Sequence, residues 1–124
     1  MAELAQLQSW IDGYLRAWNS NAPSEIGQLF AEDGVYYTAP FRQPWRGRAS
    51  IVAGWLGRKD EPGQTRFTWH PVIVTDDVCI VQGVTEYLTV PPHTFSNLWL
   101  IRLDQQGQCF EFTEWWMEQP STNQ

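Results

Sequence analysis

Residues 95–118 read FSNLWLIRLDQQGQCFEFTEWWME, and this stretch predicts two long strands joined by a tight turn over 104–107. Apolar and polar residues alternate along both arms, and Asp-x-x-Gly suits a hairpin turn. One face of the first arm carries Asn97, Trp99, Ile101 and Leu103. One face of the second carries Phe110, Phe112, Glu114 and Trp116, with Cys109, Glu111, Thr113 and Trp115 opposite. The turn leaves the register open, because a slip by one residue puts Glu111 rather than Glu114 on the inner face.

The rest of the chain predicts helices first and strands afterwards. Apolar spacing indicates helices over 3–19, 25–30 and 49–57, with Ser24 as the cap of the second helix after Pro23. The second and third helices are separated by a turn over 31–34, a short strand over 35–38 and a loop over 39–47. Strands over 65–75 and 78–90 precede the hairpin. Helices segregated from a mainly antiparallel sheet make an α+β domain. We expect one domain over 1–118 with a polar tail over 119–124.

Charge and composition narrow the functional classes. The net charge of −6 argues against nucleic acid and anionic membranes as partners, since both attract a positive surface. Six of the eight basic residues nevertheless lie between positions 42 and 66, a pattern more typical of a solvated face around a helix than of an anion site. No leader, no long apolar run and no CxxC pair is evident, so we expect a cytoplasmic protein.

The chain is unusually rich in tryptophan, with eight in 124 residues. So many large aromatic side chains predict an apolar pocket, an oligomer interface or both. We expect the pocket to be lined by Trp18, Trp55, Trp69, Trp99 and Trp116, with Trp10 and Trp115 as candidates for a dimer face. The two distant histidines and scattered acids lack the spacing of a metal site, and neither a metal nor a cofactor is expected.

The chain resembles the nuclear transport factor 2-like superfamily and, within it, the SnoaL-like proteins. The resemblance lies in three segments and their order: YLRAWNS…IGQLFAEDGVYY (14–37), PWRGRASIVAGW (44–55) and LWLIRLDQQGQCFEFTEWWME (98–118). The resemblance covers nearly the whole chain. It implies a cone-shaped, curved antiparallel sheet wrapped by three N-terminal helices, the cystatin-like roll, around an open pocket. It also implies a homodimer packed through the outer face of the sheet.

The same resemblance implies several catalytic patterns, most of which this chain does not match. The tyrosine of ketosteroid isomerase corresponds to Tyr14, but its two aspartates fall on Thr38 or Ala39 and on Trp99. The histidines of scytalone dehydratase have no convergent counterpart in His70 and His93. The arginine of limonene epoxide hydrolase has no inward counterpart, since Arg102 is expected on the outer face. The polyketide cyclases of the SnoaL type keep an acid on the last strand, where Glu114 stands here. That match favours the register with Glu114 inside.

Glu114 is therefore the first catalytic candidate and Tyr14 the second. A carboxyl group among Trp99, Phe112 and Trp116 loses solvation, which raises its pKa toward the range useful for proton transfer. The alternative is a buried structural glutamate bonded to Asn97 or Tyr14. Glu86 would add a second acid to the pocket if its face of the strand is the inner one, but a solvated position is favoured. Glu111 and Arg102 suit an ion pair across the two strands of the hairpin. The expected ligand contacts are Trp18, Tyr36, Trp55, Trp69, Asn97, Trp99, Phe112 and Trp116.

Two main hypotheses of function follow. The first is a cofactor-independent isomerase, cyclase or dehydratase acting on a small, mostly apolar or aromatic molecule, with Glu114 as acid or base. The second is a binding protein for such a molecule without catalysis. A third possibility is a dimeric interaction module, which requires that the cavity be filled by the protein's own side chains.

Overall fold

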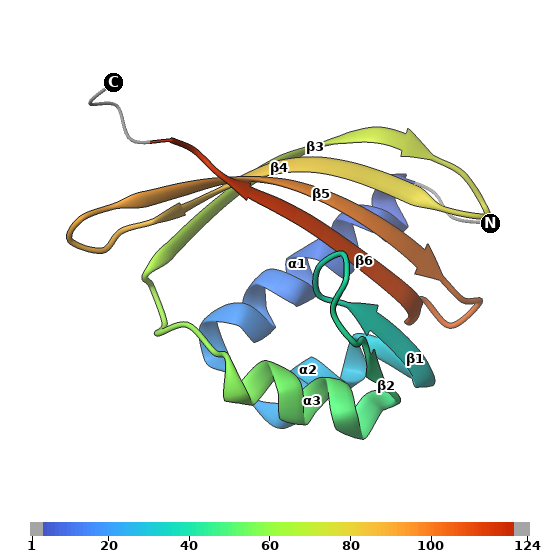
Figure 1. Cartoon of the computed structure of the whole chain (residues 1–124). Helices are drawn as coiled ribbons and strands as arrows, with labels where there is room; N and C mark the ends of the chain where they lie inside the picture. Colours follow the sequence, from blue (N-terminus) through green and yellow to red (C-terminus); the bar gives the residue numbers. More distant parts are fainter. Residues whose placement is uncertain (1–3, 121–124) are drawn as a thin grey trace.

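The computed structural model describes residues 4–120, in which a strongly curved sheet arches over three helices (Figure 1). The helices are α1 (Leu4–Ser20), α2 (Pro23–Gln28) and α3 (Arg48–Gly57). The strands are β1 (Phe30–Tyr37), β2 (Trp45–Arg46), β3 (Thr65–Val74), β4 (Cys79–Tyr87), β5 (His93–Leu103) and β6 (Cys109–Glu118). All helices lie on the concave side of the sheet (Figure 1), which confirms the expected α+β architecture. Residue 3 of the first expected helix and residues 121–124 of the expected tail lie outside the described part.

The strands form one sheet in the order β2-β1-β6-β5-β4-β3. Strands β3 to β6 make the expected antiparallel meander, with Trp99 opposite Glu114 and Arg102 opposite Glu111. The sheet is mixed rather than wholly antiparallel, because β1 pairs with β6 in parallel. The sequence pattern around β1 predicted a short strand but not its partner.

The region from α2 to β1 differs from the expectation in its boundaries. Pro23 occupies the first turn of α2 after Ala22, in place of a cap by Ser24, and proline suits this position because its missing N–H would have no helical partner. Phe30 begins β1 instead of ending the helix. The expected turn over 31–34 lies inside β1 as a bulge, since the register against β6 shifts between Phe30 and Val35. A Cβ on Gly34 would lie 3.1 Å from two backbone oxygens, closer than most Cβ contacts, so the bulge favours a glycine.

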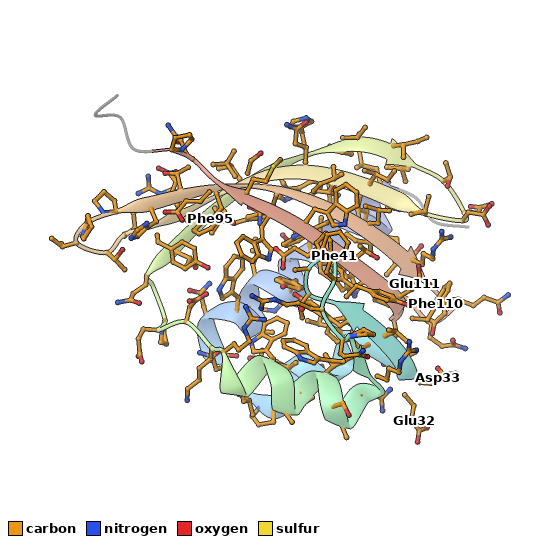
Figure 2. All side chains as sticks on the ribbon, viewed as in Figure 1. Glu32, Asp33, Phe41, Phe95, Phe110 and Glu111 are labelled. Carbon is orange, nitrogen blue, oxygen red and sulfur yellow. The ribbon has the colours of Figure 1, made fainter. Side chains whose placement is uncertain are left out.

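A second irregularity, a bulge in β6, places two side chains of the hairpin on the opposite faces of the sheet from those expected. Leu103 pairs with Cys109 while Arg102 pairs with Glu111, so Phe110 is the extra residue on β6. Cys109 is therefore buried and Phe110 is 42% exposed, the reverse of the expected faces. From Glu111 onward the alternation holds, and Glu114 lies on the inner face. Figure 2 shows Phe110 and Glu111 at the end of β6 that lies farthest from Phe95.

The core lies between the concave face of the sheet and α1. Leu7, Ile11, Phe30, Trp99 and Phe112 are fully buried there. Trp10, which was a candidate for a dimer face, is also buried, and its Nε1 donates a 2.9 Å hydrogen bond to the carbonyl of Leu29. The expectation for Trp10 was wrong because the apolar stripe of α1 is directed at the sheet of the same chain. Within residues 4–120, no helix is long and apolar enough to cross a membrane.

Candidate functional site

A cavity of about 250 Å³ lies between the concave face of the sheet and helices α1 and α3. Its buried end is lined by Tyr14, Tyr36, Thr85 and Asn97, with Glu114 beside them. Aromatic side chains form the walls, and the exposed residues Arg58 and Lys59 lie at the outer end. The complete lining is Tyr14, Trp18, Tyr36, Thr38, Trp45, Trp55, Arg58, Lys59, Asp60, Thr85, Tyr87, Phe95, Asn97, Glu114 and Trp116.

The carboxyl group of Glu114 receives hydrogen bonds from three side chains. Asn97 Nδ2 and Trp99 Nε1 each donate to Oε2 over 3.0 Å. Tyr36 OH donates to Oε1 over 3.5 Å, which is longer than a normal hydrogen bond. Strand pairing explains the first two contacts, because Asn97 and Trp99 share the inner face of β5, and β5 pairs with β6. Oε1 is therefore the oxygen of Glu114 with more capacity for a ligand.

Two buried tyrosines extend this hydrogen-bond chain. Tyr14 OH and Tyr36 OH are 2.8 Å apart, and Tyr36 contacts Glu114 in turn. Burial raises the pKa of both phenols well above 10, and the charge of Glu114 raises both further. The contact between the two hydroxyls raises the pKa of Tyr36 and lowers that of Tyr14, without cancelling the effect of burial. Both tyrosines are therefore neutral hydrogen-bond donors at physiological pH. Tyr14 comes from α1 and Tyr36 from β1, so this chain of hydrogen bonds depends on the packing of the helix against the sheet.

Burial also raises the pKa of Glu114 above its ordinary value. The hydrogen bonds from Trp99, Asn97 and Tyr36, followed by the charge of Arg58, oppose this effect without cancelling it. A carboxyl group whose pKa is raised by burial is a stronger base than an exposed one, and its protonated form persists to higher pH. The site thus has the electrostatics of a general acid or base.

Asn97 is held in one orientation by Thr85. The Thr85 hydroxyl donates a 2.7 Å hydrogen bond to Asn97 Oδ1, and both side chains are buried. The amide nitrogen of Asn97 is then directed toward Glu114. Because neighbouring groups satisfy both ends of the amide, Asn97 positions the carboxyl group rigidly.

Three hydrogen bonds fix Asp60 at the outer end of the cavity. Its Oδ2 accepts from Trp18 Nε1 over 2.8 Å and from Tyr87 OH over 3.3 Å. Its backbone carbonyl accepts from Asn21 Nδ2 over 2.9 Å. Asn21 also accepts a hydrogen bond from Trp55 Nε1 over 3.3 Å. The segment after α3 is consequently attached to the end of α1 and to β4.

Comparison with known proteins now identifies the family. A family model for the SnoaL-like domain matches residues 11–114, which is most of the chain. This chain belongs to the SnoaL-like family. The expected membership is therefore confirmed, and the match includes both Tyr14 and Glu114. No curated protein matches the chain by sequence.

Solved structures support the fold of this SnoaL-like chain. A ketosteroid isomerase-like protein from Erwinia carotovora atroseptica SCRI1043 has a TM-score of 0.69 at 20% identity, over 95% of this chain and 98% of its own. The epoxide hydrolase/cyclase-like enzyme SalBIII, described in pyran ring formation of the polyether salinomycin, has a TM-score of 0.71 at 14% identity, over 89% of both chains. At these identities the likeness concerns the fold alone.

Seven of the expected site residues line the cavity of this SnoaL-like chain: Tyr14, Trp18, Tyr36, Trp55, Asn97, Glu114 and Trp116. The other three lie in or against the core instead. Trp99 and Phe112 are fully buried, so they support Glu114 and the tyrosines from below the cavity surface. Trp69 packs against the core from β3, the edge strand, which contributes no residue to the cavity wall.

The remaining lining residues were not foreseen from the sequence. Thr85 and Tyr87 follow from the alternation of β4, whose other face carries Glu86 beside Arg66 at 4.0 Å. That placement agrees with the solvated position favoured for Glu86. Trp45 and residues 58–60 come from irregular segments, for which periodicity gives no signal. Among the described residues, no three His, Cys, Asp or Glu side chains gather where a metal ion would bind.

Proposed function

We propose that this SnoaL-like protein is a cofactor-independent enzyme that transfers a proton on a small, mostly apolar molecule. The observation that carries the proposal is Glu114, a carboxyl group of raised pKa that faces an aromatic cavity and is held by Asn97, Trp99 and Tyr36. Isomerisation, cyclisation and dehydration are the reaction classes that a single acid–base carboxyl group serves.

In this proposal Oε1 of Glu114 is the reacting atom. Oε2 already accepts two N–H donors, so a proton on the carboxyl group resides on Oε1, beside Tyr36. The protonated group can donate to a carbonyl, hydroxyl or ether oxygen, and the ionised group can remove a proton from carbon. Tyr14 and Tyr36 supply neutral donors that stabilise negative charge developing on a substrate oxygen.

The test compares wild type with Glu114→Gln against a panel of small cyclic ketones, epoxides and alcohols. Mass spectrometry detects dehydration and cyclisation, and deuterium uptake from heavy water detects proton exchange at carbon. We expect Glu114→Gln to lower turnover by about 10²- to 10⁴-fold, the usual contribution of general acid–base catalysis. Glu111→Gln is the matched control, because Glu111 pairs with Arg102 on the outer face of the same strand. Equal turnover in wild type and Glu114→Gln refutes the proposal.

The second candidate is a binding protein without catalysis. It is favoured by the internal hydrogen bonds of Glu114, which satisfy the carboxyl group without a ligand. Tight binding by wild type, with no turnover of any bound compound, would support this candidate. An interaction module with a filled cavity agrees less well with the open volume of about 250 Å³.

We further propose a homodimer that forms through the outer face of the sheet. Exposed apolar side chains gather on that face, among them Val84, Phe110, Trp115 and Met117. Met117 and Val84 both lie opposite Ser96 in the strand pairing, so they belong to one continuous surface. A dimer that covers this surface would remove the apolar side chains from water.

We also propose that the protein works in the cytoplasm. Cys79 and Cys109 are both free and buried. Free thiols persist in reducing compartments, which supports this location.

A further inference from the structure

Two cations lie at the outer end of the cavity, within reach of anything bound inside it. Arg58 and Lys59 are exposed cavity-lining residues directly after α3. Within residues 4–120, neither side chain makes a hydrogen bond or an ion pair. Two other basic residues of the same stretch have partners, since Arg48 Nε donates to the carbonyl of Phe30 and Arg66 lies 4.0 Å from Glu86.

The backbone that carries these cations is held in place. The three hydrogen bonds to Asp60 attach the segment to α1 and β4, and the backbone N–H of Arg58 donates to the carbonyl of Trp55 over 3.0 Å. Gly63 N–H also donates to Asn19 Oδ1 over 3.1 Å. The positions of Arg58 and Lys59 relative to the cavity are therefore determined before any ligand binds.

Among residues 4–120, no carboxylate lies within the 4.0 Å of an ion pair from Arg58 or Lys59. Asp60 is adjacent in sequence, but its Oδ2 accepts from Trp18 and Tyr87 rather than from a cation. Glu114 borders the buried end of the cavity, where burial raises its pKa and the charge of Arg58 lowers it. At the outer end of the cavity, the two cations Arg58 and Lys59 therefore lie beside a single lining carboxylate, that of Asp60.

We propose that the ligand is an organic acid, with an apolar body among the indole rings and a carboxylate at Arg58 and Lys59. The inference rests on the proposed function of the same cavity and specifies its ligand class. The planar guanidinium of Arg58 suits bidentate binding of a carboxylate, and Lys59 adds a flexible second charge. Binding at both ends of the cavity orients the reacting oxygen of the ligand toward Glu114.

The size of the cavity limits the apolar body. Its volume of about 250 Å³ lies below the range of roughly 300–1,000 Å³ typical of pockets for drug-sized ligands. A fused bicyclic ring with a short acidic side chain is a suitable probe. The acid 2-naphthylacetic acid and the amide 2-naphthylacetamide have nearly the same shape but differ in charge, so a comparison of their binding reports on the contribution of the cations.

Calorimetric titration of wild type with both compounds at neutral pH measures this contribution. We expect the acid to bind about two- to fivefold more tightly than the amide, the effect of a partly solvated ion pair. Arg58→Gln, Lys59→Gln and the double variant should reduce this preference, with the double variant abolishing it. Added salt should weaken binding of the acid and leave binding of the amide unchanged, because salt screens exposed charges.

Arg66→Gln is the matched control, since Arg66 lies in the same basic stretch but pairs with Glu86 on the outer side of the sheet. It should retain the preference for the acid. Equal binding of the acid and the amide, or binding of neither, overturns the proposal, as does a preference that survives in the double variant. Thermal melts show whether Arg58→Gln weakens α3, and the salt titration of wild type needs no variant. The turnover test of Glu114→Gln is independent, so the two proposals can fail separately.

Discussion

Trp99 and Glu114 face each other across β5 and β6, and the indole Nε1 of Trp99 donates a 3.0 Å hydrogen bond to Oε2 of Glu114. The donor is fully buried, while the acceptor borders the cavity. Phe67 stacks on the indole with ring centres 4.6 Å apart and an angle of 13° between the planes. The acid candidate is thus oriented by a side chain that is itself held by packing, as functional sites require.

Trp99→Phe should raise the pKa of Glu114, because the hydrogen bond from Trp99 lowers it in the wild type. The smaller ring should also lower the free energy of unfolding by about 1–3 kcal/mol, through a small cavity and a lost hydrogen bond. Carbon-13 NMR of labelled glutamate carboxyl groups, followed across pH, measures the pKa directly. Trp115→Phe is the control, since Trp115 is 53% exposed on the outer face. An unchanged pKa in Trp99→Phe would contradict the orienting role of the indole.

The stability of the protein should depend on the protonation of Glu114. Its pKa is raised in the folded state, so in the pH range between 4.5 and that raised value the folded protein holds a proton that the unfolded chain has released. The free energy of unfolding contributed by Glu114 therefore falls as pH rises through this window. Urea unfolding of wild type and Glu114→Gln from about pH 4 to about pH 8 measures the difference between the two. The stability of wild type relative to Glu114→Gln should decline with rising pH.

Glu111→Gln provides the control for this titration, because Glu111 lies on the same strand but on the outer face. The stability of wild type relative to Glu111→Gln should not show the decline expected for Glu114→Gln. A difference between wild type and Glu114→Gln that stays constant with pH would show that burial does not perturb this carboxyl group.

Gly83→Ala should destabilise the support beneath the site. A Cβ at Gly83 would lie 2.5 Å from Phe67 Cζ, so Phe67 would have to leave its stack on Trp99. We expect a loss of about 1–3 kcal/mol, the usual cost of overpacking a core. Gly57→Ala is the matched control, because a Cβ there meets no atom within 4 Å. Chemical denaturation of both variants checks the contrast, and equal stabilities would argue against this packing.

Trp115→Ser should shift the proposed dimer toward monomer, because it removes a large apolar side chain from the outer face of the sheet. Analytical ultracentrifugation over a range of concentrations measures the dissociation constant. Leu4→Ser is the control, since Leu4 is 45% exposed but belongs to α1, which lies on the concave side of the sheet (Figure 1). A monomeric wild type, or equal dissociation of both variants, would contradict the proposed interface.

Much of the fold could be predicted from the sequence because its patterns are local. The apolar stripe of residues 4–20 and the alternation in β3 to β6 depend on neighbours within one element. The irregular positions could not be predicted in this way. Phe110 and Cys109 exchange faces through one extra residue, and the bulge between Phe30 and Val35 arises only when β1 pairs with a strand distant in sequence.

The order of residues was enough to predict the SnoaL-like architecture and the inward position of Glu114, since it contains both the period-two alternation and the family motifs. Which aromatic residues border the cavity, and which support it from the core, became clear from the packing of the folded chain. Trp99 and Trp116 share one sheet face, yet Trp99 is fully buried and Trp116 is 38% exposed. The structure also joined Tyr14 to Tyr36 and brought Arg58 to the cavity, because helix packing and loop anchoring depend on contacts between segments far apart in the chain.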